Sequence, residues 1–558
     1  MATYYVKNGG NNAASGLSDA LAWETFAYAA SKTYSAGDSI LFKRGDTFAI
    51  SYNTTWTLSG TGSEGNVITV GAYDSGAKPI LTQLETTSGS WTYYGSGNIW
   101  YKSIAGYVKR CWWDGAESGK ATSIGGISAS PCRWFFNDAN DTLYLYDGSA
   151  TDDPNVVYTT ITINRGQTIF SATDVDYWTF DNLEITGSCT QFYLGGSADH
   201  LTIQNCNLYD LGIDPDGSYT IYSSFYGSAN NDYLSFLDND VDNHLNLISQ
   251  DLPAETNMVV GDCINMESNS NHWLIRGNTF NDCGHVTVQI NGWVTTEGRT
   301  ANDNIIEYNT FLNDGSPYNC PFQFTGRTGK CMRTIFRYNY LEHHNLGAAI
   351  AGEDTECYYN IFYHADHNPV MNWSTPGLTL FTTNAIYVCN GAKVYNNLMK
   401  DCTGEGLVLL YFAAVGPFNA LIKNNIIVNC GNGPSNWGLS IGTAIFIETG
   451  VSTTNVIDKN CVYNASYANT IWYQTSESHT LAWADAYTTE FVSNLATDPL
   501  VGADFKIAAG SPCINAGVDV GLTEDYAGNL IVGLPDIGAY EYPGGAVTAV
   551  TIFFGCNF

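Results

Sequence analysis

The chain has 558 residues, with 54 acidic side chains against 22 Lys and Arg and a formal net charge of −32. Such an acidic chain disfavours nucleic acid as a partner, because the phosphates would be repelled. The rest of the composition is polar, weakly charged and rich in Tyr and Trp. This favours carbohydrate, since aromatic faces stack on sugar rings and amides bind hydroxyl groups. The alternative is that most aromatic side chains fill the walls of the fold.

Residues 1–85 are predicted to cap the fold and to form its first coils. Apolar residues at helical spacing from Leu21 to Ala30 predict a short amphipathic helix, and Ser39–Lys43 alternates as a strand. The opening residues lack the charged and apolar regions of a signal peptide, and no apolar run is long enough to span a membrane. We therefore expect no membrane insertion.

Residues 86–164 are rich in Trp, Tyr and Phe and do not follow the pattern of the later repeats. They are predicted to form a β-rich insertion. Its aromatic residues favour a small core of their own, with a sugar-binding platform as the alternative.

Residues 165–470 repeat a short phrase: an apolar residue, two variable residues, Asn, one more residue and a second apolar residue. Clear instances are Ile275–Phe280, Ile306–Phe311 and Phe336–Leu341, which start 31 and 30 residues apart. About ten phrases occur, at spacings typical of solenoids. They lack both helical periodicity and the leucine-rich pattern, so the sequence predicts a parallel β-helix. The recurring Asn is expected inside a tight turn, bonded to the backbone of neighbouring coils.

Cysteine recurs at one place of the repeat, eight residues after the phrase begins. The instances are Cys283, Cys402 and Cys430. The total of 15 Cys is odd and no pair has metal-finger spacing. We therefore expect buried free thiols stacked inside the coil.

A second strand of the repeat begins near residue 285. Alternation directs its apolar residues Val286, Val288 and Ile290 inward and its polar residues outward. The outward set is His285, Thr287, Gln289 and Asn291.

Polar residues also recur seven places after the phrase begins. The instances are Asp282, Asn313, His343, His364, Asp401 and Asn429. Adjacent coils are about 4.8 Å apart, so His343 and His364 are predicted neighbours, with His344 beside them. The alternative is that these residues cap coil backbone in a turn.

Residues 471–558 are predicted to close the solenoid. Their last part, 546–554, is apolar and strand-like. Such a strand favours pairing with another subunit, and a homotrimer is the assembly we consider.

Both ends of the chain carry motifs that resemble one group of proteins. The opening reads YYV, a Gly/Asn-rich turn, then GD-x-x-x-FK-RGDTF, and residues 495–541 include DPLVGADFKIAAGSPCINAG and DIGAYEY. With the repeats, these motifs resemble polysaccharide-active proteins of the pectate-lyase-like superfamily, which includes phage tailspike depolymerases. The resemblance implies a single-stranded right-handed parallel β-helix. It leaves the chemistry open, because the superfamily contains hydrolases, lyases, epimerases and non-catalytic adhesins.

In this superfamily the substrate groove usually lies on the strand after the third turn and on that turn itself. Placing the repeats in this register gives two sets of candidates. The catalytic candidates are Asp262, Glu267, His285, His343 and Glu353. The substrate-binding candidates are Asn265, Gln289, Asn291, Gln323, Arg327, His344 and His364.

Among the catalytic candidates, Asp262 and His285 form the most specific pair. The motif GDCIN, which contains Asp262, and the dipeptide GH, which contains His285, resemble part of the polygalacturonase-type pattern. That family has two Asp residues at the first motif, and this chain has one. A carboxylate and an imidazole on adjacent coils can transfer a proton to a glycosidic oxygen. Hydrolysis also needs a second carboxylate within roughly 5 to 10 Å, for which Glu267, Glu353 and Asp354 are candidates. Glu353 stands in a turn that is polar in most repeats, which favours a structural role for it.

β-Elimination is the second reaction class. It would use a base such as His343, with Arg327 or a bound Ca²⁺ neutralising a uronate, although no calcium-loop spacing is present. We predict a polysaccharide depolymerase that needs no cofactor and acts outside the cell or on a virion surface, with hydrolysis ahead of elimination. A non-catalytic glycan-binding adhesin is the alternative from another class.

Overall fold

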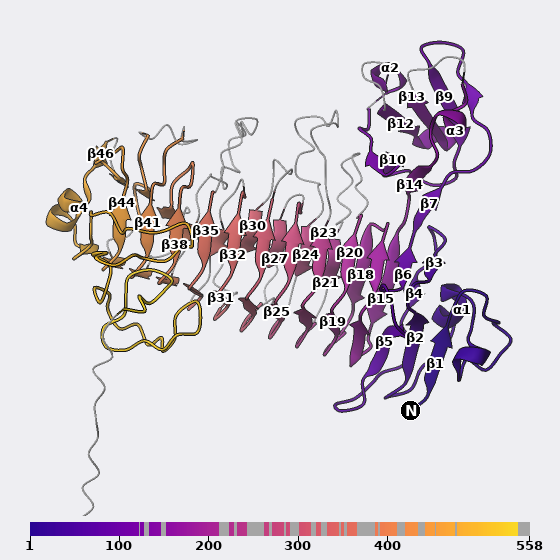
Figure 1. The fold of residues 1–558 in the computed structure, drawn as a ribbon, viewed down its shortest axis with the longest axis horizontal. Helices are drawn as coiled ribbons and strands as arrows, with labels where there is room; N and C mark the ends of the chain where they lie inside the picture. Colours follow the sequence, from indigo (N-terminus) through magenta and orange to yellow (C-terminus); the bar gives the residue numbers. More distant parts are fainter. Residues whose placement is uncertain are drawn as a thin grey trace, which may run out of the picture. The chain divides into compact units, whose positions relative to one another are not determined.

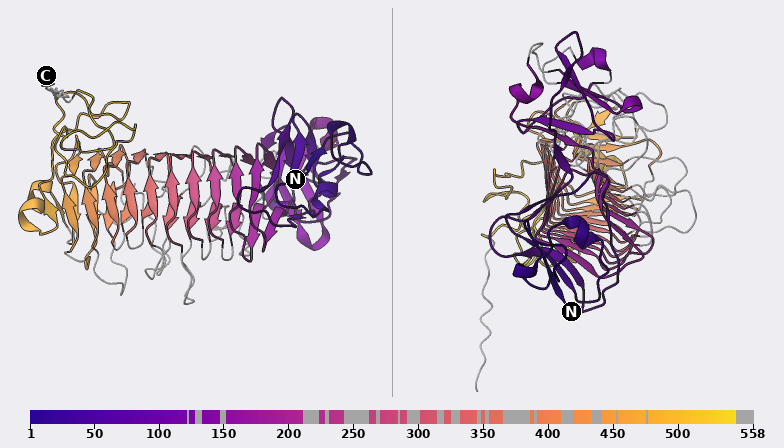
Figure 2. Two further views of the ribbon diagram at one scale, coloured as in Figure 1. Left: turned by 90° about the horizontal axis from the view of Figure 1, so that it is seen from below. Right: turned by 90° about the vertical axis from the view of Figure 1, so that its right-hand side faces the viewer.

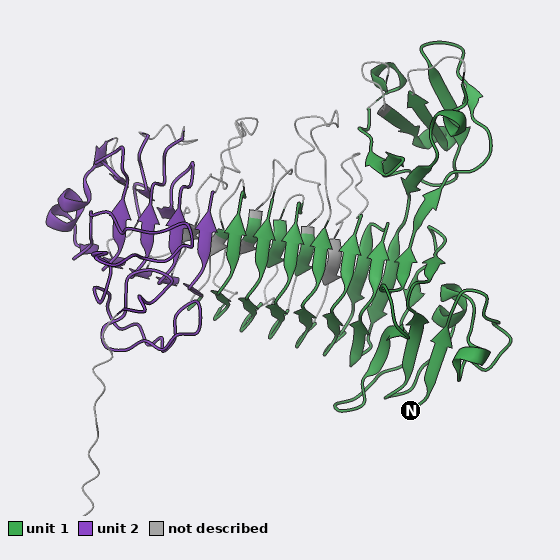
Figure 3. Cartoon of the chain, in the orientation of Figure 1, with its two compact units in different colours: residues 1–355, 368–381 green, residues 356–367, 382–558 purple. Residues whose placement is uncertain are grey.

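The computed structural model describes most of the chain, as two compact units. One unit comprises residues 1–355 and 368–381, and the other comprises 356–367 and 382–558 (Figure 3). The described residues are 1–121, 123–127, 133–146, 152–210, 223–227, 231–242, 262–266, 270–283, 286–290, 301–313, 320–324, 332–344, 348–350, 354–364, 386–388, 391–409, 419–433, 441–451, 454–474 and 477–544.

The first unit is built from three parallel sheets, A, B and C, whose successive strands come from successive coils (Figures 1 and 2). Its sheet A contains β1 (Thr3–Val6), β2 (Ser39–Lys43), β5 (Ile68–Tyr73), β16 (Trp178–Asp181), β19 (Thr202–Gln204), β22 (Ser235–Leu237), β25 (Leu274–Arg276), β28 (Ile305–Glu307) and β31 (Ile335–Arg337). Its sheet B contains β3 (Thr47–Ala49), β6 (Ile80–Thr82), β17 (Glu184–Thr186), β20 (Asn207–Tyr209), β23 (Asp240–Asp242), β26 (Thr279–Asn281), β29 (Thr310–Leu312) and β32 (Tyr340–Glu342). Its sheet C contains β4 (Trp56–Thr57), β15 (Thr168–Thr173), β18 (Thr190–Gly195), β21 (Ser223–Gly227), β24 (Asp262–Met266), β27 (Val286–Ile290), β30 (Cys320–Phe324) and β33 (Ala348–Ile350).

The second unit repeats the same three-sheet plan. Its sheet A contains β34 (Glu356–Tyr358), β37 (Lys393–Tyr395), β40 (Leu421–Lys423), β43 (Val456–Asp458) and β47 (Phe491–Val492). Its sheet B contains β35 (Ile361–Tyr363), β38 (Leu398–Lys400), β41 (Ile426–Val428) and β44 (Cys461–Tyr463). Its sheet C contains β36 (Ile386–Val388), β39 (Leu407–Leu409), β42 (Ile445–Ile447), β45 (Ile471–Tyr473) and the antiparallel β46 (Ser478–His479). The predicted parallel β-helix is therefore confirmed.

The core of each coil comes from the apolar residues of the repeated phrase. Ile275 pairs in register with Ile306, and Ile306 with Phe336, and all three are at most 1% exposed. On sheet B, the ring of Phe280 stacks on that of Phe311 at 5.2 Å. Burying side chains of this size stabilises the fold by about 1.5–3 kcal/mol each, so every phrase contributes to the core.

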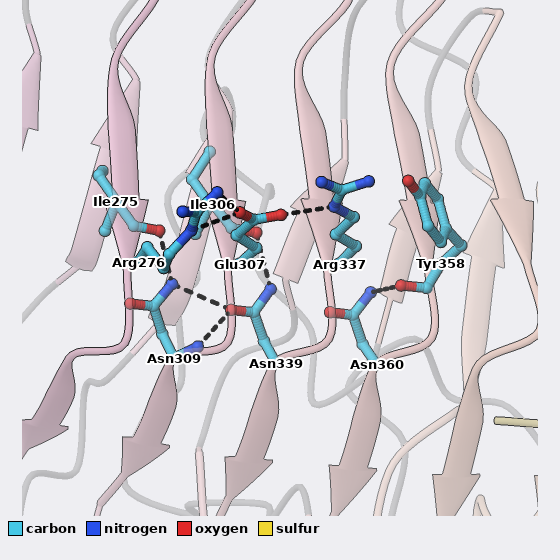
Figure 4. Close-up of polar contacts among 9 residues, drawn as sticks. All are labelled: Ile275, Arg276, Ile306, Glu307, Asn309, Arg337, Asn339, Tyr358 and Asn360. Atoms are coloured by element: carbon cyan, nitrogen blue, oxygen red, sulfur yellow. Dashed lines mark hydrogen bonds and ion pairs between the residues drawn. The ribbon is translucent and has the colours of Figure 1, made fainter. Parts of the chain in front are cut away.

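The corner between sheets A and B holds the recurring Asn. Asn309 donates from Nδ2 to the carbonyl oxygen of Ile275 at 2.9 Å and to Oδ1 of Asn339 at 3.1 Å. Its own Oδ1 accepts the backbone N–H of Asn278 at 3.0 Å. Asn339 bonds in the same way to the carbonyl oxygen of Ile306 (Figure 4). The predicted role of the Asn as a link between coils is confirmed, and these buried amides pair with backbone groups that would otherwise be buried without a partner.

The insertion contains two antiparallel sheets and an aromatic core. One sheet is β7 (Leu84–Thr86), β14 (Ile161–Asn164), β10 (Arg110–Trp113) and β11 (Ala116–Glu117). The other is β8 (Thr92–Tyr93), β9 (Ile99–Ser103), β13 (Thr142–Tyr146) and β12 (Arg133–Asn137), with α2 (Ile124–Ile127) and α3 (Pro154–Val157) in the same segment. Trp91, Trp113, Trp134 and Phe136 are buried together. The expectation of a small aromatic core, rather than a platform, is confirmed for these residues.

The helix expected near the N-terminus is shorter than predicted. Only α1 (Phe26–Ala30) and a 3₁₀ turn (Asp19–Leu21) form, while Trp23 makes an isolated bridge to Val6. Thr25 ends the extended stretch and caps the helix, since its side chain accepts the N–H of Tyr28. Helical spacing before residue 25 was therefore misleading.

The C-terminal segment of the second unit combines one helix with irregular chain. α4 (Leu481–Tyr487) is capped by Thr480. Farther on, the N–H of Gly538 donates to the carbonyl oxygen of Asn424 at 2.7 Å, and Asn396 donates to that of Asp536 at 3.2 Å. This segment therefore packs on the A–B corner of its own unit.

Candidate functional site

The connections between strands differ sharply around the coil. From sheet A to sheet B, every coil from β16 onward uses two residues. In the first unit, the connection from β6 to β15 holds the whole insertion; the other connections from B to C range from 3 residues to 19, and those from C to A range from 4 to 14. In solenoids, insertions that vary from repeat to repeat mark the binding face. Sheet C and the two corners beside it therefore form the candidate site.

One column of residues on sheet C carries aromatic and amide side chains. The strand register aligns Ser171, Tyr193, Tyr226, Asn265, Gln289 and Gln323. The residues on either side of Asn265 and Gln289, such as Ile264 and Val288, are fully buried in the core. Because side chains alternate along a strand, those of Ser171, Tyr193, Asn265 and Gln289 lie on the outer face of sheet C. None of the column's members is charged.

The outer face of this sheet is more covered than we predicted. Val286, Val288 and Ile290 are buried as expected. Thr287 and Gln289 were predicted to lie outside, but they are only 1% and 9% exposed, and Asn265 is 3% exposed. Alternation still directs them away from the core, so these three side chains lie under other groups, whereas Ser171 and Tyr193 in the same column are only half-buried.

The cysteine prediction was wrong at one place. Cys263, in β24, forms a disulfide with Cys283, at the corner after β26, with a Cα–Cα distance of 6.1 Å. Cys402 and Cys430 are buried free thiols, as predicted. Stacking of successive coils brings the start of one sheet C strand next to the corner of the following coil, which is where this bond forms.

The disulfide fixes the chain next to two catalytic candidates. Asp262 is the first residue of β24 and directly precedes Cys263, while His285 follows Cys283 by two residues. The side chain of Asp262 and all of His285 lie outside the described residues, as does the side chain of Gln323. Glu267, Asn291, Arg327 and Glu353 lie outside them as well. Their roles stay predictions.

The histidine candidates occupy turns. His343 follows β32 with a left-handed backbone (φ 56°), and its Nε2 lies 3.7 Å from Oε1 of Glu342. Its carbonyl oxygen accepts the amide of Asn313 at 3.0 Å, so it joins coils in the way the structural alternative described. His344 is 1% exposed. His364 belongs to the second unit, where its ring stacks on Tyr363 at 3.8 Å, and its predicted neighbourhood with His343 stays a prediction.

The sequence reading missed a stack of four rings at the C–A corner. The rings belong to Tyr177, His200, Tyr233 and His272, with centroids 4.4, 4.8 and 4.7 Å apart. Each residue has a left-handed backbone and stands three places before the inward apolar residue of its phrase. That spacing in the sequence could have predicted the stack. Because the ring faces are used against one another, the stack supports the coil rather than offering a platform for sugar.

A buried ion cluster on sheet A was also missed. Glu307 is fully buried, and Nε of Arg276 and Nε of Arg337 donate to its two oxygens at 2.6 Å each (Figure 4). The strand register puts these three residues side by side. Both arginines are committed to Glu307, which makes the cluster a link between coils.

Comparison with known proteins gives distant likenesses only. No family model and no curated protein matches the chain. Among solved structures, it is similar to a GH136 lacto-N-biosidase from Eubacterium ramulus (13% identity, 89% of this chain and 68% of that chain, TM-score 0.44). It is also similar to pectate lyase Pel9A (12%, 97% and 96%, 0.40) and to the PL6 family polysaccharide lyase Pedsa3628 from Pseudopedobacter saltans (13%, 96% and 99%, 0.41). At this distance these likenesses carry no argument about activity. In the described part of the chain, no helix has the length and apolarity to cross a bilayer.

Proposed function

We propose that this protein is a polysaccharide depolymerase that cleaves glycosidic bonds of an extracellular or cell-surface glycan along sheet C. The observation that carries the proposal is the uncharged Tyr and amide column on the outer face of sheet C, flanked by the connections of variable length. A long, regular row of this kind suits a polymer with many hydroxyl groups. The net charge of −32 favours a substrate that is neutral or only locally acidic.

Hydrolysis is the reaction we favour. Asp262 begins β24 and Glu267 directly follows it, and the Cys263–Cys283 disulfide ties the chain beside Asp262 to the chain just before His285. One carboxyl group would protonate the leaving oxygen, and a second would activate water or attack the sugar carbon. His285 would help hold or transfer the proton. β-Elimination through His343 and Arg327 is the second reaction, and it would act on a uronate polymer.

A non-catalytic adhesin is the second candidate function. The observation that favours it is that the aligned column itself contains neither a carboxylate nor a base. Catalytic groups must then come from the corners beside the column. Under either function, we propose that the protein is extracellular or on a virion surface and that it forms a homotrimer.

A panel of neutral and acidic polysaccharides tests these alternatives in one experiment. New reducing ends and the ultraviolet absorbance of an unsaturated uronate are followed together. Reducing ends without absorbance indicate hydrolysis, and both signals together indicate elimination. Glycan binding without either signal across a broad panel would refute the enzyme in favour of the adhesin. D262N, E267Q and H285Q then assign the reaction, with the exposed Tyr308→Ala as the matched control outside sheet C.

A further inference from the structure

A lysine and a cysteine are in direct contact between the insertion and the coil. Lys109 precedes β10 and Cys189 precedes β18. Nζ of Lys109 contacts Sγ of Cys189, and Sγ lies 3.0 Å from the carbonyl oxygen of Gly166, which Nζ also contacts. Lys109 is only 8% exposed, so its long side chain is held inside the protein against the sulfur.

The surroundings of Lys109 differ from those of nearby cations. Arg110 pairs with Glu117, and Arg165 pairs with Glu85. Across the described part of the chain, no carboxylate lies within ion-pair distance of Lys109. A buried cation is normally paired with an opposite charge. In place of a carboxylate, Nζ of Lys109 contacts Sγ of Cys189, which is a reactive group.

We propose that Lys109 and Cys189 form an oxidative modification site, at which Nζ and Sγ become covalently joined. The co-reactant is a peroxide. It first oxidises the thiol to a sulfenic acid, and one water leaves as the O–O bond breaks. The amine of Lys109 then attacks sulfur, the N–S bond forms, and the hydroxyl group leaves as a second water with a proton from nitrogen. One amine, one thiol and one hydrogen peroxide thus give one sulfenamide and two waters.

The bond would fasten the insertion to the solenoid. It joins residues that are 80 positions apart in the chain. A covalent link across so long a segment restricts the unfolded chain and raises stability. The oxidised protein should therefore unfold at a higher temperature than the reduced one, independently of any activity on glycans.

Peptide mapping of the full-length protein tests the proposal. After treatment with hydrogen peroxide and digestion, the peptides that contain Lys109 and Cys189 should appear joined, about 2 Da lighter than their sum, and a thiol reductant should separate them. The Cys263–Cys283 disulfide is also reducible, so the link must be located by peptide rather than by whole mass.

Three variants decide the assignment. K109R keeps the positive charge and C189S keeps the size, and both should abolish the joined peptide and the oxidation-dependent rise in Tm. K120R is the matched control, because Lys120 is 7% exposed and contacts Tyr107 instead of a sulfur. It should behave like the wild type. Oxidation of Cys189 to the sulfinic acid without a joined peptide, or a joined peptide that persists in K109R, would overturn the proposal.

Discussion

The A–B corner and the corners beside sheet C differ in how far their lengths vary from coil to coil. The A–B corner has two residues in every coil from β16 onward, a left-handed residue or glycine in most coils, and a buried Asn that bonds to the next coil. Apart from the insertion between β6 and β15, the corners beside sheet C range from 3 residues to 19 in the first unit. At the A–B corner the buried Asn side chains bond to backbone groups and to Asn side chains of neighbouring coils, so its length cannot change without leaving buried polar groups unpaired. The corners beside sheet C also hold links between coils, such as the bond from the backbone N–H of Asn302 to Oδ1 of Asn271, but their lengths differ, so there the chain can accept the insertions that build a site.

Disrupting the A–B corner should have the largest effect on stability. Asn309→Ala removes the donor to Ile275 and the acceptor for Asn278, and both backbone groups would stay buried. Each orphaned group costs about 1–3 kcal/mol, so a loss of about 3 kcal/mol is expected in denaturant unfolding. Tyr308→Ala at the adjacent exposed position should lose much less. Equal losses for the two variants would contradict a ladder that supports the coil.

Removing the disulfide beside sheet C should lower both the stability of the protein and its rate of glycan cleavage. The Cys263–Cys283 bond closes a separation of 20 residues, and its loss in C263S should cost about 3 kcal/mol. Glycan cleavage should fall even well below the unfolding temperature, because the chain that carries Asp262 is no longer tied to the chain before His285. A thiol reductant should lower the Tm of the wild type and leave C263S unchanged. Full activity in C263S would show that the bond serves stability alone.

Removing one ring from the C–A corner should have a moderate effect. Tyr233 stacks on both His200 and His272, whereas Tyr308 stacks only on Tyr338 among the described rings. Tyr233→Ala should therefore cost about 1–2 kcal/mol in thermal or denaturant unfolding, and Tyr308→Ala about half of that. Glycan cleavage should persist in both variants. A loss of substrate affinity in Tyr233→Ala alone would instead make this stack part of the substrate path.

The smallest expected effect is a pH dependence in the C-terminal segment. Burial, with Asp536 and Asp525 nearby, raises the pKa of Glu541 to about 7, and burial also raises that of Asp536. A raised carboxyl pKa favours the folded state when the group is protonated, so this contribution is lost as pH rises through about 7. Glu541→Gln should flatten the slope of Tm against pH between about 4.5 and 7. An unchanged slope would assign the dependence to other groups.

The fold could be predicted because its determinants are local and repeated. The phrase at Ile275, Ile306 and Phe336 encodes an inward residue, a turn and a second inward residue, and this period alone defines parallel stacking. The helix from Leu21 was overextended, because helical spacing does not reveal that Trp23 makes a bridge to Val6. Spacing gives a propensity, while tertiary pairing decides the structure.

The site was harder to predict, for two physical reasons. A repeat register cannot show that Cys263 and Cys283 meet, because one lies in a sheet C strand and the other at a corner of the following coil. Outward alternation also does not guarantee exposure, as Thr287 and Gln289 show. The sequence did name Asn265, Gln289 and Gln323 as substrate-binding candidates, and the strand register aligns them on successive strands, while their role stays a prediction.

The most direct test compares kcat/KM on the best polysaccharide of the panel for E267Q and H285Q, beside sheet C, with that for Tyr308→Ala, at the A–B corner. The account predicts a loss of at least about 100-fold for the first two, as expected for removal of an acid–base group, and near wild-type values for the third. Unfolding temperatures close to that of the wild type would show that the loss is chemical. Wild-type rates in both sheet C variants would contradict the claim that this face carries the reaction.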